Sequence, residues 1–116
     1  MTEEFVIGNE GKRDIKFIGR LISSASTSAD RAYTSYYSGK TGKYEKLSLY
    51  KTDTGKYVCS VYHGTQWQGS RSQRYSKCCS TTDEIVAFLI AQFDGEFHWI
   101  AKELLDDAGL DYAEKV

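Results

Sequence analysis

Residues 44–63 read YEKLSLYKTDTGKYVCSVYH and contain the strongest structural signal in the chain. Leu47 and Leu49 alternate with polar side chains, and a second alternating run follows a Thr-Asp-Thr-Gly segment. Alternation with a period of two is typical of a strand with one buried face, and a glycine supplies the positive φ that a tight turn often needs. The stretch therefore predicts a β-hairpin with strands at residues 44–51 and 56–63.

Two further strands are expected on either side of this hairpin. Residues 15–22 are rich in β-branched and aromatic side chains, and residues 72–79 follow a Gly- and Ser-containing segment. Gly19 is expected to mark a bulge in the first of these strands. Residues 23–43 are rich in serine, tyrosine and glycine. We expect a flexible loop there, because long segments without regular structure tend to be functional or disordered. The short apolar patch at residues 5–7 is assigned no element.

The hydrophobic period changes from two to about 3.6 in the last third of the chain. Thr81 and Glu84 have the spacing of a capping box, and apolar residues then recur on one face. This pattern predicts helices at residues 82–93 and 97–108, separated by an Asp-Gly break and ended by Gly109. The predicted fold class is α+β: a single domain over residues 1–116 with an antiparallel meander of about four strands, followed by two C-terminal helices on one face.

Charge divides the chain into two unequal parts. Residues 11–80 hold 13 Lys/Arg and 4 Asp/Glu, a net charge of +9, and eight of the nine tyrosines also lie there. Residues 81–116 hold 2 Lys/Arg and 9 Asp/Glu, a net charge of −7. Three carboxylates in residues 1–10 bring the total to −1. Such an asymmetry informs about partners and association, not about the fold.

A basic and aromatic set of residues is the candidate partner-binding surface. Tyr, Trp and Arg are enriched at the energetic centres of protein interfaces, and the same mixture stacks bases and neutralises phosphates in single-stranded nucleic acid. The set comprises Arg31, Tyr33, Tyr36, Tyr37, Lys40, Lys43, Trp67, Arg71, Arg74, Tyr75 and Lys77. We expect part of the aromatic content to pack within the sheet and part to lie on the surface, because tyrosine is a good strand former. The acidic helical face is the alternative interface, and a solvated acidic surface is its ordinary explanation.

Metal and cofactor chemistry is not expected from this sequence. Cys59 and His63 are four residues apart on a strand, which separates them by about 13 Å and prevents one tetrahedral metal from binding both. Cys78 and Cys79 are adjacent, so their side chains point to opposite faces. A small enzyme using His63 or His98 remains an alternative hypothesis, although no motif assigns either residue a reaction.

The first hypothesis is therefore a non-catalytic interaction protein, a small regulator or inhibitor of the type that phages and mobile elements encode as accessory or anti-defence proteins. Its expected partner is a protein, with nucleic acid as the alternative and a homodimer left open. The longest apolar run, residues 85–91, is far shorter than the roughly 20 residues of a membrane span. The acidic N-terminus lacks a secretory signal pattern, and the three cysteines favour a reducing compartment. We expect a cytoplasmic protein without a membrane partner.

Overall fold

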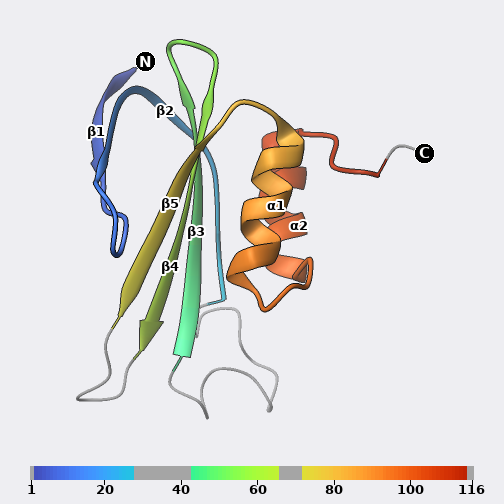
Figure 1. Cartoon of the computed structure of the whole chain (residues 1–116). Coiled ribbons are helices and arrows are strands. Elements are labelled where there is room, and N and C mark those ends of the chain that lie inside the picture. Colours follow the sequence, from blue (N-terminus) through green and yellow to red (C-terminus); the bar gives the residue numbers. More distant parts are fainter. Residues whose placement is uncertain (1, 28–42, 66–71, 115–116) are drawn as a thin grey trace.

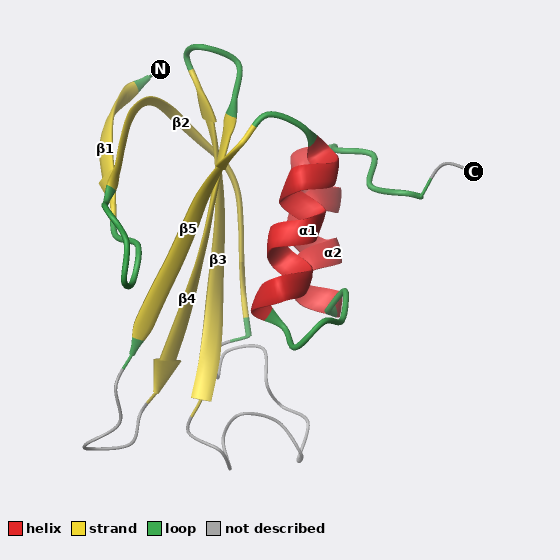
Figure 2. Ribbon diagram, viewed as in Figure 1, coloured by secondary structure: helices red, strands yellow, loops and turns green. Residues whose placement is uncertain are grey.

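The computed structural model describes residues 2–27, 43–65 and 72–114. Five antiparallel strands form a curled sheet, and two helices pack side by side against one of its faces (Figure 1 and Figure 2). The strands lie in the sheet in chain order, as a meander requires. The expected α+β architecture with two C-terminal helices is confirmed, with one strand more than expected. No helix in the described part of the chain is long and apolar enough to cross a membrane.

The additional strand forms on the short apolar patch near the N-terminus. There, Phe5 pairs directly with Phe17 of the next strand, and their rings stack with centroids 5.3 Å apart. Cross-strand aromatic pairs of this kind stabilise a sheet. The elements are β1 (Glu3–Ile7), β2 (Ile15–Ser26), β3 (Lys43–Thr52), β4 (Tyr57–Thr65), β5 (Gln73–Cys79), α1 (Thr82–Gln92) and α2 (Trp99–Ala108).

The loop expected at residues 23–43 is wrong for its first residues, which continue β2 to Ser26. Ser23 pairs with Leu49 on β3, and the buried Ser23 hydroxyl donates a hydrogen bond to the Leu104 carbonyl of α2, 2.7 Å away. Small side chains fit here because α2 packs closely on β2. Pairing and helix packing therefore override the loop-like composition. Residues 28–42 of the expected loop lie outside the described residues.

A bulge in β2 exchanges the two faces of the strand. The pairing register with β3 shifts between Leu21 and Ser23, so the bulge is not at Gly19 as expected. Gly19 instead packs against β3, where an added Cβ would overlap the Lys51 carbonyl oxygen. One β2 strand thus presents Phe17 away from the helices and Ser23 towards them.

The hairpin turn and the helix ends follow their sequence signals. Gly55 has φ 87° in the β3–β4 turn, and Gly109 ends α2 with φ 73°. The Thr81 side chain accepts a hydrogen bond from the Glu84 backbone amide, at 3.2 Å. The expected capping residue is confirmed, and it satisfies one of the backbone donors that a helix start leaves unpaired.

The core lies between the sheet and the helices. Leu47, Leu49 and Val61 on β3 and β4 pack into the same cluster as Leu89 of α1 and Leu104 of α2, each at most 1% exposed. These residues alternate along the strands, so the helix-covered face is apolar and the opposite face is left without a helical layer. We call this opposite face the open face.

Candidate functional site

The open face carries polar side chains aligned in rows across the sheet. Ser24, Ser48, Ser60 and Ser76 occupy directly paired positions on β2, β3, β4 and β5. Lys46, Tyr62 and Arg74 are paired in the same way on β3, β4 and β5, each two residues away from the serine of its strand. Directly opposed side chains on one face lie about 5 Å apart at their Cβ atoms. We call the second group the cation–tyrosine row.

Direct contacts organise the cation–tyrosine row. The Arg74 guanidinium lies 5.1 Å from the centroid of the Tyr62 ring, and its Nη1 donates a hydrogen bond to Ser60 Oγ, 2.8 Å away. Tyr44 extends the row, with its ring centroid 6.1 Å from that of Tyr62. Lys46 is exposed, and its Nζ lies 5.6 Å from the Tyr44 ring centroid. The arrangement presents two cations over two tyrosine rings, within cation–π range.

The β1–β2 turn closes against β5 and fixes the position of Arg74. The Glu10 amide donates to the Arg74 carbonyl at 2.7 Å, and the Asn9 side chain accepts from the Ser76 amide at 3.1 Å. The Ser76 hydroxyl donates to the Gly8 carbonyl at 2.8 Å. The turn between the first two strands is therefore hydrogen-bonded to the last strand, next to the cation–tyrosine row.

The structure divides the candidate partner-binding set. Arg74 lies on the open face, whereas Tyr75 and Lys77 lie on the helix side of the same strand, because neighbouring residues of a strand alternate between faces. Lys43 begins β3. The remaining candidates lie outside the described residues: Arg31, Tyr33, Tyr36, Tyr37, Lys40, Trp67 and Arg71.

The strands that flank those remaining candidates nevertheless end at one end of the sheet (Figure 1). β2 ends at Ser26 and β3 starts at Lys43, while β4 ends at Thr65 and β5 starts at Gln73. Tyr44, Lys46 and Tyr62 were absent from the candidate set, although they lie near these strand ends. The alternation of β3 placed Lys46 on the face opposite the leucines. Only the pairing register brings it next to Tyr62 of β4 and Arg74 of β5.

Both histidines line a second feature, a hollow of about 530 Å³ on the helix side of the sheet. Glu45 and His63 are directly paired across β3 and β4, with Glu45 Oε2 3.7 Å from His63 Nδ1. On its other side, His63 Nε2 lies 3.1 Å from Gln92 Oε1 of α1. The lining residues are Glu45, His63, Gln92, Phe93, Asp94, Glu96 and His98.

The surroundings of the two imidazoles shift their pKa values in opposite directions. The Glu45 carboxylate raises the pKa of His63 above its ordinary value, against the effect of burial. Burial lowers the pKa of His98. The Nδ1 atom of His98 also accepts a hydrogen bond from the Ile100 amide, at 3.1 Å, so its lone pair caps α2. The contacts of His63 therefore suit the protonated ring, and those of His98 suit the neutral ring.

Of the three cysteines, one is exposed and two are buried. Cys78 is exposed and Cys79 is buried, which confirms that they point to opposite faces. Burial raises the pKa of the Cys59 thiol and raises that of Cys79 to about 11, so both are protonated at neutral pH. Across residues 2–27, 43–65 and 72–114, no group of three or more His, Cys, Asp or Glu side chains has metal-binding geometry.

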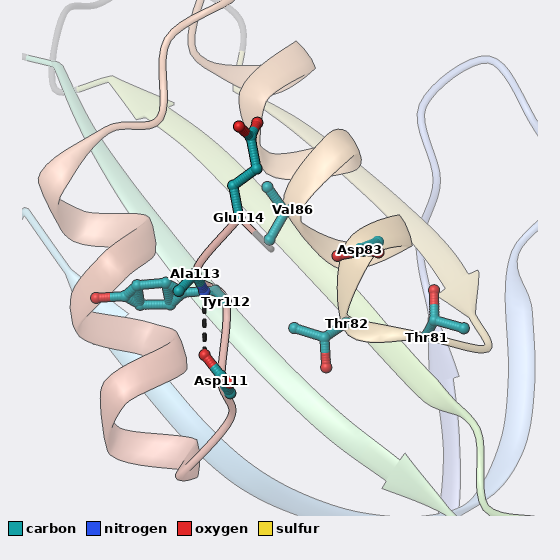
Figure 3. Close-up of a pocket in the computed structure, with 8 residues that line it drawn as sticks. All are labelled: Thr81, Thr82, Asp83, Val86, Asp111, Tyr112, Ala113 and Glu114. Carbon is teal, nitrogen blue, oxygen red and sulfur yellow. Dashed lines mark hydrogen bonds between the residues drawn. The ribbon is translucent and has the colours of Figure 1, made fainter. Parts of the chain in front are cut away.

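An acidic hollow of about 520 Å³ lies where the C-terminal tail passes the start of α1 (Figure 3). Asp83 of α1 and Asp111 and Glu114 of the tail contribute carboxylates to it. Asp111 Oδ1 accepts a hydrogen bond from the Ala113 amide, at 3.1 Å, which turns the tail locally. This hollow belongs to the acidic helical face that was the alternative interface.

Comparison of the chain with protein-family models, with curated proteins and with solved structures finds no match.

Proposed function

We propose that this chain is a non-catalytic interaction protein, a small regulator or inhibitor that captures a partner protein on the open face of its sheet. The observation that carries the proposal is the cation–tyrosine row formed by Lys46, Tyr62 and Arg74 in register on three strands. Tyrosine and arginine at the centre of an interface contribute large contact areas together with polar groups. Such a row is suited to carboxylate side chains of an acidic partner surface.

Prior ordering of the row supports this role. Arg74 is already held by Ser60 and lies over Tyr62, so less side-chain freedom is lost when a partner binds. The row also lies outside the core cluster that the sheet forms with the helices. A protein partner is favoured over nucleic acid because the formal net charge of −1 disfavours a long polyanion. Nucleic acid binding through the same row is the alternative that an experiment must separate.

Lys46→Glu and Lys77→Glu form a matched pair for the test. Both lysines are exposed strand residues and both substitutions change the charge by −2, but only Lys46 is on the open face. Partners are captured from cell extract with the tagged full chain and identified by mass spectrometry, with and without nuclease treatment. We expect Lys46→Glu to lose the captured protein and Lys77→Glu to retain it.

Two outcomes would contradict the proposal. Equal capture by both variants would remove the open face as the interface. Loss of capture after nuclease treatment, together with direct binding of single-stranded probes that weakens steeply with salt, would establish the nucleic acid alternative instead.

A further inference from the structure

The hollow that contains both histidines is also where the end of α1 is fastened to the sheet. Thr27 Oγ1 donates to Glu45 Oε1 at 3.2 Å and accepts from the Glu45 amide at 2.8 Å, so the carboxylate is held in place. Its second oxygen faces His63, which in turn contacts Gln92, the last residue of α1. A continuous line of polar side chains therefore runs from Thr27, just after β2, through β3 and β4 to the helical layer.

The contacts of His63 favour the doubly protonated ring. Oxygen atoms of Glu45 and Gln92 face its two nitrogens, and both oxygens are hydrogen-bond acceptors. A neutral imidazole carries one N–H only and satisfies one of them. A proton on His63 thus completes the connection between the sheet and α1.

The contacts of His98 favour the neutral ring. Its Nδ1 accepts the hydrogen bond from the Ile100 amide, and a proton on that nitrogen would abolish this cap of α2. Its ring stacks on Phe93, with centroids 4.6 Å apart and an interplanar angle of 25°. Phe93 in turn lies edge-on to His63, 6.1 Å away, so one phenyl ring contacts both imidazoles.

Groups from every neighbouring element face this pair. Glu45 approaches from β3, Tyr75 of β5 lies edge-on to His63 at 5.9 Å, and Gln92 comes from α1. Asp94 and Glu96 of the α1–α2 connection add negative charge. The described residues that line the hollow include no lysine or arginine. The surrounding carboxylates therefore favour a proton on His63, whereas burial opposes a second proton on His98.

We propose that His63 and His98 form a two-step pH latch, in which a proton on His63 fastens α1 to the sheet and a second proton, on His98, releases the cap of α2. The inference does not depend on the proposed binding function.

The two steps have opposite effects on stability. His63 has a raised pKa in the folded state, so its contribution is complete below the unfolded-state pKa and is lost as the pH rises through the folded-state value. His98 has a lowered pKa, so its contribution is present above the unfolded-state pKa and is lost as the pH falls through the folded-state value. Stability should therefore pass through a maximum between the two titrations.

The chain contains only two histidines, which makes the test direct. Imidazole NMR signals of the full chain are followed between about pH 5 and 8, and each is assigned by its absence in His63→Gln or His98→Asn. We expect the midpoint of His63 above the ordinary value of about 6.5 and that of His98 below it. The Ile100 amide signal should titrate with His98, because that amide donates to its ring.

Urea unfolding of the same proteins gives the second measurement. In His63→Gln, the free energy of unfolding should no longer decrease as the pH rises above the maximum. His98→Asn should lose part of the decrease on the acid side, since asparagine caps a helix without titrating in this range. Equal midpoints, a reversed order or an Ile100 signal that follows His63 would overturn the latch. The wild-type titration alone decides the order if a variant does not fold.

Discussion

The two faces of the sheet use the same strands for different purposes. On β3, Leu47 and Leu49 are buried beneath the helices, while Ser48 between them points to the open face and is half-buried. On β4, Val61 joins the core and its neighbour Tyr62 joins the cation–tyrosine row. Burial of apolar area is the main stabilising contribution to a fold, so the helix-covered face holds the structure together. The open face carries the cation–tyrosine row, together with the fully buried Val58 of β4.

The largest test of this comparison substitutes two adjacent residues of β3. Leu49→Ala should lower the free energy of unfolding by about 2–5 kcal/mol, because it leaves a cavity beneath the helices. Ser48→Ala removes one hydroxyl from the open face, and we expect a change within about 0.5 kcal/mol. Urea unfolding monitored by circular dichroism compares the two variants. Similar losses for both would show that the open face contributes to stability as much as the core does.

Local signals in the sequence explain which parts of the fold were predictable. The β3–β4 hairpin, the Thr81 cap and the Gly109 helix end depend on neighbouring residues, and all three are found. The end of β2 has a loop-like Ser- and Ala-containing composition, and its pairing with β3 overrides that propensity. β1 contains the strand formers Phe5, Val6 and Ile7, but it is only five residues long and its assignment depends on pairing with β2.

The candidate site was predictable only in part, for the same reason. Arg74 was identified by its charge and aromatic neighbours. Tyr75 and Lys77 belong to the same candidate set, but they point to the helix side of β5. Lys46 and Tyr62 join Arg74 only through the register of three strands. The pairing of His63 with His98 around Phe93 likewise depends on the packing of α1 against β4. Residue type indicated the chemistry, and register determined which residues act together.

A second pair of neighbours tests the face exchange at the β2 bulge. Ser23 is buried and donates to the Leu104 carbonyl, and it lies 3.0 Å from Asp107 Oδ2, whereas Ser24 is exposed on the open face. Ser23→Ala should cost about 1–2 kcal/mol, because it removes a buried hydrogen bond to α2. Ser24→Ala should change stability by less than about 0.5 kcal/mol. The same urea measurement checks both variants, and a larger loss at Ser24 would contradict the assignment of faces.

The smallest expected effect concerns the ordering of the cation–tyrosine row. The Arg74 guanidinium lies over the Tyr62 ring at a partly exposed site, where a cation–π contact contributes about 0.5–1 kcal/mol. A double-mutant cycle with Arg74→Gln and Tyr62→Leu isolates this contribution from the Arg74–Ser60 hydrogen bond, because that bond is lost equally in both backgrounds. A favourable coupling in this range would show that the row is ordered before any partner binds. A coupling energy of zero would mean that Arg74 moves independently of the ring, and the open face would then lose the prior ordering on which the proposed interface depends.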